Sequence, residues 1–386
     1  MRILIPLTIS FLFISQVILA QNQTAKKYVN VELFTNTWCG LCAFSDPAAT
    51  ATYEANKKDI HLTTVYPNVP YPQCPFNRAN TLDNNTRKEY YGVTSTPRTF
   101  TQGTQLNSGS NLLTQSFIDS QTGQTSPLRL EVIETGLSTN KGVYVYVKSF
   151  DTPPAGDLRL FVAAVVERVN FNAQNGLTEH DNVLWQYLTN ENGDPITLPS
   201  AGNSTGAFFT YNTNNLTHES FEANEVHVIA FIQNYNTKEV INSGSSKDIV
   251  IDAVVTNSTC GINNGAIDLS VRGGNGSYNV QWSNGSTNED LSGIVNGNYA
   301  VTVSDGAGAE VNSTITVNCN MSSCNPSFNF SGSQFISEVY QVGETITSNA
   351  TINANITYSA GERITLNKGF STNNPHDFHA VIEGCN

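Results

Sequence analysis

Charged residues are scarce in this chain of 386 residues. They make up 13% of the sequence, whereas an average globular protein has about 25%. Only 19 residues are Lys or Arg, against 32 Asp or Glu, and the formal net charge is −13. No cluster of basic residues occurs, which argues against nucleic acid or an anionic membrane surface as a partner.

Long apolar runs are missing after the N-terminus. The one such run, Ile3–Leu19, follows Arg2, and Ala20 before Gln21 is a small residue suited to signal-peptide cleavage. We therefore expect residues 1–20 to be a signal peptide, with an uncleaved membrane anchor as the alternative. Nothing later approaches the roughly 20 apolar residues that a membrane helix needs, so we expect no transmembrane segment in the mature chain.

Cysteine is also rare, and its number, seven, is odd. An exported chain can form disulfides, so at least one cysteine is free, transiently paired or modified. A single Cys-x-x-Cys motif would need two more ligands to hold zinc, and neither a second pair nor a His doublet lies nearby. We expect no metal and no cofactor other than a redox-active disulfide.

Four segments differ in their patterns. Residues 28–126 alternate strand-like and helix-like stretches, which is typical of an α/β domain. Residues 127–252 and 253–319 carry alternating apolar patterns between Asn- and Gly-rich turns, which favours two β-sandwich domains of immunoglobulin-like type. Residues 332–386 contain very short, closely spaced strand signals, which favours stacked β coils. The expected fold class is a multidomain α/β plus all-β protein.

The strongest local motif is Trp38-Cys39-Gly40-Leu41-Cys42. It follows an apolar strand signal at Val29–Phe34 and precedes a helix-like stretch. A helix N-terminus stabilises a thiolate through its dipole and free N–H groups, so we expect the pKa of Cys39 to lie below that of an ordinary thiol. Cys42, one turn later, is placed to attack a mixed disulfide at Cys39. Cys39 is the expected nucleophile and Cys42 the resolving thiol.

A second motif, Thr96-Pro97, lies at the entrance of a later strand signal, where proline is tolerated and its peptide bond can be cis. Together, the Trp-Cys-Gly-x-Cys and Thr-Pro motifs resemble the thioredoxin superfamily, in which a cis-proline loop faces the dithiol. The resemblance implies that Pro97 belongs to the catalytic set with Cys39 and Cys42. It also implies that Trp38 and Thr96 bind the substrate chain.

The sequence departs from that pattern in two places. The spacer is Gly-Leu in place of Gly-Pro, and no Asp occupies the usual position before the motif, where Glu32 is a candidate proton acceptor instead. The alternative is therefore that Cys39 and Cys42 form an inert structural disulfide in a domain without redox activity. Cys74 is either a third redox partner or a buried free thiol. His180 is more readily explained by hydrogen bonding than by catalysis.

The first two segments together resemble a family named for a twenty-eight-kilodalton bacterial outer membrane protein. The motifs that carry this resemblance are Glu32–Thr35, Trp38–Gly40, Tyr90–Pro97, Ala164–Glu167 and His180–Leu184. The resemblance implies a thioredoxin-like domain followed by a β-sandwich, exported by a Gram-negative bacterium of the Bacteroidota. It does not imply a substrate.

The third segment looks like one repeat of the SprB type from gliding-motility adhesins. The carriers are Asn263–Leu269, Val280–Gly285 and Gly297–Val303. Cys260 and Cys319 flank this module and are candidates for a disulfide that clasps its ends. In the chain-entropy model, a disulfide that closes the loop between Cys260 and Cys319 would add about 4 kcal/mol to the stability of the module.

The tail is similar to a C-terminal sorting domain that ends in Gly-Cys and any residue. The carriers are Tyr358–Leu366, Gly369-Phe370 and Gly384-Cys385-Asn386. The resemblance implies type IX secretion and retention at the cell surface, with Cys385 processed or attached. A disulfide between Cys324 and Cys385 that closes the domain is the alternative.

Two functions of different classes follow. In the first, the chain is an exported protein of the outer membrane, cell surface or extracellular space that exchanges disulfides with protein thiols. In the second, it is a non-catalytic surface or adhesion protein that binds an unknown surface ligand, with the thioredoxin-like fold as a scaffold.

Overall fold

The computed structural model describes four long ranges of the chain and several short ones. The long ranges are 25–108, 113–136, 139–259 and 262–320, and the short ones are 327–331, 333–334, 338–342, 345–352, 356–360, 363–373 and 378–381. The predicted signal peptide and three of the disulfide candidates, Cys260, Cys324 and Cys385, lie outside the described residues. Both predicted pairings of these cysteines therefore stay predictions.

The described part of the chain is mostly β-sheet, with few helices and several sheets. It divides into two compact units, one ending at Ser246 and one beginning at Lys247. The domain boundaries predicted from the sequence stay predictions. The one placed at 252–253 falls within a strand of the second unit, β15 (Ile249–Thr256).

The first unit contains all the α-helices of the described residues and fourteen strands. The helices are α1 (Gly40–Ala55), α2 (Pro75–Ala79), α3 (Thr81–Tyr91) and α4 (Gln115–Gln121), with 3₁₀ turns at Thr213–Asn215 and Ala223–Glu225. The strands are β1 (Ala25–Lys26), β2 (Val29–Phe34), β3 (Ile60–Val65), β4 (Arg98–Thr101), β5 (Thr104–Ser108), β6 (Thr125–Ser126), β7 (Leu128–Thr135), β8 (Asn140–Ser149), β9 (Leu158–Asn170), β10 (Glu179–Tyr187), β11 (Asp194–Pro195), β12 (Ser204–Asn212), β13 (Val226–Asn234) and β14 (Val240–Ser245).

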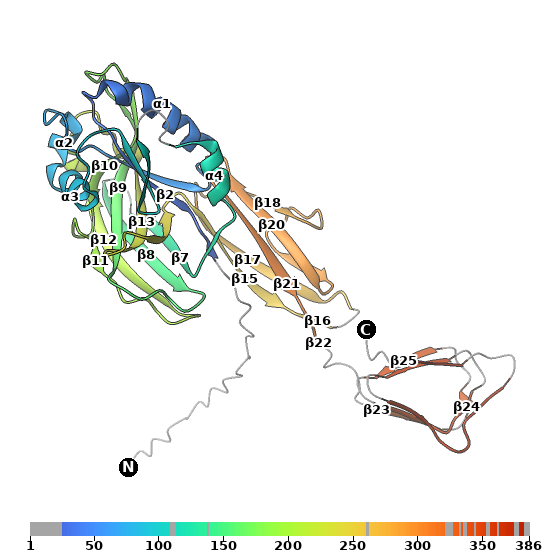
Figure 1. Ribbon diagram of the computed structural model, residues 1–386. Coiled ribbons are helices and arrows are strands. Elements are labelled where there is room, and N and C mark those ends of the chain that lie inside the picture. Colours follow the sequence, from blue (N-terminus) through green and yellow to red (C-terminus); the bar gives the residue numbers. More distant parts are fainter. Residues whose placement is uncertain are drawn as a thin grey trace, which may run out of the picture. The chain divides into compact units, whose positions relative to one another are not determined.

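One nine-stranded sheet organises this unit (Figure 1). Its order is β14-β13-β9-β10-β3-β2-β4-β5, and β11 also pairs with β9. Strand β3 is parallel to both β2 and β10, whereas β4 is antiparallel to β2. Strands from residues 28–126 and from residues 127–252, which the sequence pattern assigns to separate domains, therefore share one sheet.

The two faces of this sheet are covered differently. Leu33, Thr64 and Val183 lie side by side in the register of β2, β3 and β10, so their side chains point to one face. That face packs against α1 and α4 at one end, and against the antiparallel sheet β12-β8-β7 at the other. The opposite face carries an aromatic core that includes Phe34 and Tyr91 of α3.

A buried ion pair within the first predicted segment also reaches the second one through a hydrogen bond. Arg87 Nε lies 2.5 Å from Glu32 Oε1, and both side chains are buried. Arg87 Nη2 also donates to Gln233 Oε1 of β13 at 2.8 Å, and Tyr91 Oη donates to Glu32 Oε2 at 2.7 Å. A buried charge pair is stable only when its remaining hydrogen bonds are made, so this network fixes α3, β2 and β13 together.

The second unit begins with two packed three-stranded sheets, β15-β17-β19 and β18-β20-β21. The additional strands are β16 (Ser258–Thr259), β17 (Gly265–Gly273), β18 (Tyr278–Trp282), β19 (Leu291–Ile294), β20 (Gly297–Asp305), β21 (Glu310–Val317) and β22 (Cys319–Asn320). Trp282 is buried in the core between the sheets, and its Nε1 donates to the Asn288 carbonyl oxygen at 2.9 Å. This is a small β-sandwich.

The last segment contains three parallel three-stranded sheets. The strands are β23 (Ser327–Phe330), β24 (Ser333–Gln334), β25 (Glu338–Val342), β26 (Thr345–Ser348), β27 (Thr351–Ile352), β28 (Ile356–Ala360), β29 (Arg363–Leu366), β30 (Ser371–Thr372) and β31 (Phe378–Val381). Each strand pairs with the corresponding strand of the next coil, for example Thr345 with Arg363. Ile346, Ile352 and Tyr358 are buried inside, which is the packing expected of stacked coils.

Candidate functional site

The Cys39–Cys42 pair forms a disulfide at the N-terminus of α1. The Cα atoms of the two cysteines are 5.2 Å apart, and Cys39 caps the helix. Cys39 Sγ accepts a hydrogen bond from the Cys42 N–H at 3.0 Å. Cys39 is 4% exposed and Cys42 is fully buried, so Cys39 is the sulfur closer to solvent. The free N–H groups of the first turn are the groups that would stabilise a Cys39 thiolate.

Thr96 and Pro97 lie against this disulfide. Phe34 at the end of β2 pairs with Arg98 at the start of β4, and this register brings the preceding residues beside the N-terminus of α1. The Thr96–Pro97 peptide bond is cis. The Thr96 carbonyl oxygen lies 3.6 Å from Cys39 Sγ. The structure thus brings together the Trp-Cys-Gly-x-Cys and Thr-Pro motifs, which lie far apart in the sequence.

Exposed apolar side chains lie within the motif and close to it in the chain or through a backbone contact. Trp38 is 38% exposed, Leu41 52% and Phe44 74%. Tyr71, 37% exposed, belongs to a loop whose main chain is held close by Asn36, because Asn36 Nδ2 donates to the Tyr71 carbonyl oxygen at 3.0 Å. These four side chains, here called the apolar rim, carry no charge. They suit contact with an uncharged, apolar stretch of polypeptide.

A buried acid, Asp46, lies one helical turn after Cys42 and on the same buried side of α1. Burial raises the pKa of Asp46 to about 7, although hydrogen bonds from Thr35 and Ser45 act in the opposite direction. The Ser45 hydroxyl lies 3.2 Å from Asp46 Oδ1 and 3.4 Å from the Cys42 carbonyl oxygen. An acid that is half-protonated near neutral pH, one turn from a buried cysteine, can exchange protons in thiol chemistry.

Glu32, the proton acceptor considered from the sequence, is not in this position. Both of its carboxylate oxygens accept hydrogen bonds from Arg87. Asp46 was not among the residues predicted from the sequence, because the usual position of the proton acceptor in the thioredoxin pattern lies before the motif. The available signal was the spacing of four residues from Cys42, which places the two side chains on one helix face.

The loop between β9 and β10 reaches the site from the second predicted segment. Asn175 N–H donates to the Thr37 carbonyl oxygen at 2.9 Å. Asn175 Nδ2 donates to the carbonyl oxygens of Asn36 at 3.3 Å and of Cys39 at 3.1 Å. These bonds fix the turn that presents Cys39. No sequence signal identified Asn175, because a polar loop residue 136 positions away has no local pattern to mark it.

Two further candidates from the sequence lie deeper. Cys74 is a buried free thiol, and Thr37 Oγ1 donates to its sulfur at 3.2 Å. His180 is buried, with Nδ1 3.2 Å from Tyr66 Oη and Nε2 3.2 Å from the Phe171 carbonyl oxygen. Burial lowers the pKa of His180 to about 4, so it is neutral at physiological pH. Both of its ring nitrogens have hydrogen-bond partners, so the role of His180 is structural.

The residues that the structure describes contain no candidate metal cluster and no candidate membrane helix. No group of three or more His, Cys, Asp or Glu is gathered there as a metal ion would need. No helix in the same part of the chain is long and apolar enough to cross a membrane.

Comparison with known proteins gives distant structural likenesses. No protein-family model and no curated protein sequence matches the chain. HBP35 of Porphyromonas gingivalis is 18% identical, with 77% of this chain and 99% of that chain covered and a TM-score of 0.49. A domain of the outer membrane lipoprotein Omp28 from Porphyromonas gingivalis is 15% identical, with 31% and 86% covered and a TM-score of 0.23. A protein from Agrobacterium tumefaciens is 14% identical, with 58% and 95% covered and a TM-score of 0.37. Likenesses this distant do not assign the chain to a family.

Proposed function

We propose that the protein is an exported thiol–disulfide oxidoreductase whose first segment is thioredoxin-like. The observation that carries the proposal is the closed Cys39–Cys42 disulfide at the N-terminus of α1, with the Thr96 carbonyl oxygen 3.6 Å from Cys39 Sγ. A sulfur at a helix N-terminus beside the backbone edge at Thr96 is suited to hold a substrate chain during exchange. Pro97 would shape that edge, and Trp38 and Thr96 would contact the substrate.

The reaction exchanges one disulfide for another. A substrate thiolate attacks Cys39 Sγ, the Cys39–Cys42 bond breaks, and Cys42 leaves as a thiolate. A second substrate thiolate then attacks the substrate sulfur of the mixed disulfide, which forms the substrate disulfide and releases the Cys39 thiolate. Two electrons pass from the substrate to the protein. The reverse sequence reduces a substrate disulfide, and the relative reduction potentials decide the direction.

Asp46 would manage the proton of Cys42. When Cys42 leaves as a thiolate in a buried site, it needs a proton, and when it attacks the mixed disulfide it must lose one. A carboxyl group whose pKa is about 7 serves both steps at neutral pH. The apolar rim would dock a polypeptide segment with apolar residues beside its cysteine.

The remaining segments would place this domain outside the cell. The predicted signal peptide, the SprB-type repeat in 253–319 and the C-terminal sorting domain in 332–386 would export and retain the chain at the outer membrane or cell surface. In the stacked coils, the buried Ile and Tyr side chains give the tail a core of its own, which supports its role as a separate module.

The test is insulin reduction by the mature protein with dithiothreitol as electron donor. The proposal expects catalysis above the dithiothreitol background, loss of activity in Cys39→Ser, and a trapped mixed disulfide in Cys42→Ser. Cys74→Ser is the matched control, because Cys74 is a buried thiol of the same unit, and it should keep full activity.

A second function is supported by the burial of the pair. Cys42 is fully buried and Cys39 only 4% exposed, which also suits a structural disulfide in a protein that binds a surface ligand through its β modules. Equal rates for the wild type and Cys39→Ser in the insulin assay would favour this alternative.

A further inference from the structure

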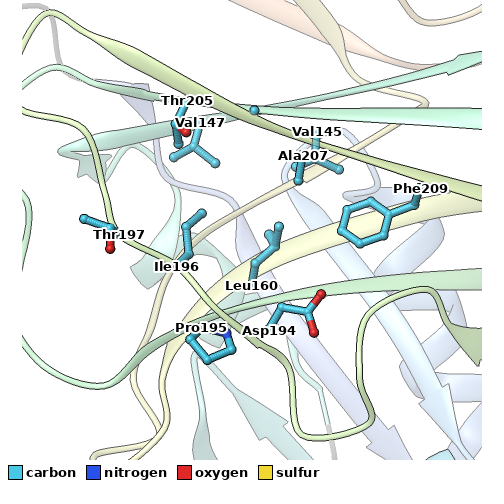
Figure 2. A pocket seen from close by; sticks show the side chains of 11 residues that line it. Val145, Val147, Leu160, Asp194, Pro195, Ile196, Thr197, Thr205, Ala207 and Phe209 are labelled. Carbon is cyan, nitrogen blue, oxygen red and sulfur yellow. The ribbon is translucent and has the colours of Figure 1, made fainter.

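A cavity of about 340 Å³ lies between the nine-stranded sheet and the sheet β12-β8-β7 of the first unit, and no cysteine lines it. The side chains of β8 and β12 line one side of it, and those of Leu160, β11 and Ile196 line the other (Figure 2). Apolar groups dominate the lining, with Asp194, Thr197 and Thr205 as the polar residues. This volume is at the lower end of the range for small-molecule sites.

The cavity exists because the nine-stranded sheet is incomplete opposite β12. Strand β11 has only two residues, Asp194 and Pro195, where it pairs with β9. The inward side chains of β8 are buried, as in a normal sandwich. Thr205, Ala207 and Phe209 of β12 also point inward but stay partly exposed, because no complete strand lies opposite them. Ala207 and Phe209 already pack against the core of this unit, and an apolar occupant of the cavity would cover the part of their side chains that is still exposed.

Asp194 gives the cavity its one charge among the described residues that line it. Its Oδ1 accepts a hydrogen bond from the Asn190 N–H at 3.1 Å. Among the residues that the structure describes, no Lys or Arg forms an ion pair with this carboxylate. The nearby Arg159 is engaged by Asp157 at 2.9 Å. An occupant with a positive group would therefore meet a complementary charge beside an apolar wall.

We propose that this cavity binds a small amphiphile that has one cationic amino group and a short apolar body. The amino group lies at Asp194, and the apolar body contacts Leu160, Ile196 and Ala207. Anionic and neutral molecules of the same shape bind more weakly, because they lack the attraction to Asp194. This site is separate from the cysteine chemistry and does not depend on it.

The test is isothermal titration of the mature, oxidised protein with n-octylamine, octan-1-ol and octanoate. We expect octylamine to bind at one site per chain and at least tenfold more tightly than octanoate. Asp194→Asn should weaken octylamine about tenfold and leave octanol unchanged. Ala207→Leu, which fills the cavity, should weaken both by at least tenfold. The control is Phe208→Ala, because Phe208 is the neighbouring β12 residue on the outer, exposed face.

Three results would overturn the proposal. One is the absence of saturable octylamine binding to the wild type. The second is equal affinity for octanoate and octylamine, which would remove the role of Asp194. The third is unchanged octylamine binding in a folded Ala207→Leu protein, which would place the amine elsewhere. If Ala207→Leu does not fold, Asp194→Asn decides alone, since unchanged octylamine affinity in that variant contradicts the proposed contact.

Discussion

Replacing Asp46 with Asn tests the buried acid beneath the disulfide. Asn keeps the shape of the side chain and can still accept from Thr35, but it cannot ionise. Burial raises the pKa of Asp46 from 3.8 to about 7 in the folded chain. The ionised carboxyl is therefore about 4 kcal/mol less favourable in the folded than in the unfolded state, as an upper figure.

The sign of the pH effect follows from proton binding. Between pH 3.8 and about 7 the folded chain holds the Asp46 proton and the unfolded chain has released it. The wild type therefore loses stability as pH rises through this window, and the loss is complete above pH 7. The amide of the Asp46→Asn variant does not titrate, so the stability advantage of this variant over the wild type should be about 3 kcal/mol larger at pH 8 than at pH 5.

The assay is urea unfolding of both oxidised proteins at pH 5 and pH 8, followed by tryptophan fluorescence. A Trp282→Phe background removes the tryptophan of the second unit, so that Trp38 and Trp185 report on the first unit alone. A stability difference that is the same at both pH values would refute the raised pKa. As a functional readout, Asp46→Asn should lose the rate inflection near pH 7 in the insulin assay, while a purely structural residue would change the rate equally at all pH values.

Other residues give further expected outcomes. Asn175→Ala removes two hydrogen bonds to the turn that presents Cys39, so dithiothreitol should reduce the Cys39–Cys42 disulfide several-fold faster. Asn172 is an exposed residue of the same loop, and the control variant Asn172→Ala should not change this rate. The wild type should lose free energy of unfolding as pH falls from 6.5 to 4, because burial makes protonation of His180 unfavourable in the folded chain, and His180→Gln should reduce this loss. If urea unfolding shows the same loss in the variant, the lowered pKa of His180 is contradicted. Arg87→Met leaves Glu32 buried without its partner and should cost about 3–5 kcal/mol in urea unfolding, and a cost below about 1 kcal/mol would show that the pair is not buried in solution.

Local features of the fold could be predicted from the sequence. The strand signal at Val29–Phe34 corresponds to β2, and the Cys39–Cys42 motif does open a helix, because apolar runs and helix N-termini are set by neighbouring residues. Each very short strand signal in the last segment is likewise a strand. Successive side chains of a strand point to opposite faces, so alternation of apolar and polar residues marks such strands locally.

The continuity of the large sheet could not be predicted. A single register pair, Val183 with Thr64, joins β10 to β3 across the predicted boundary. Periodicity shows which residues form strands but not which strand edges meet. The Arg87–Gln233 hydrogen bond that links the two segments also depends on a contact between distant positions. At the site, Asn175 could not be predicted for the same reason, because it contacts Cys39 from a distant position in the chain. Asp46 could have been predicted, because it lies four residues after Cys42 on the same side of a helix.

The most direct measurement for the central claim is the reduction potential of the Cys39–Cys42 pair in the mature protein. The protein is equilibrated with thiol–disulfide buffers of known potential, the thiols are trapped, and mass spectrometry of the peptide containing both cysteines gives the reduced fraction. A value between about −270 and −120 mV would place the pair among working oxidoreductases, as the account predicts. A value below about −300 mV would identify a structural disulfide and contradict it.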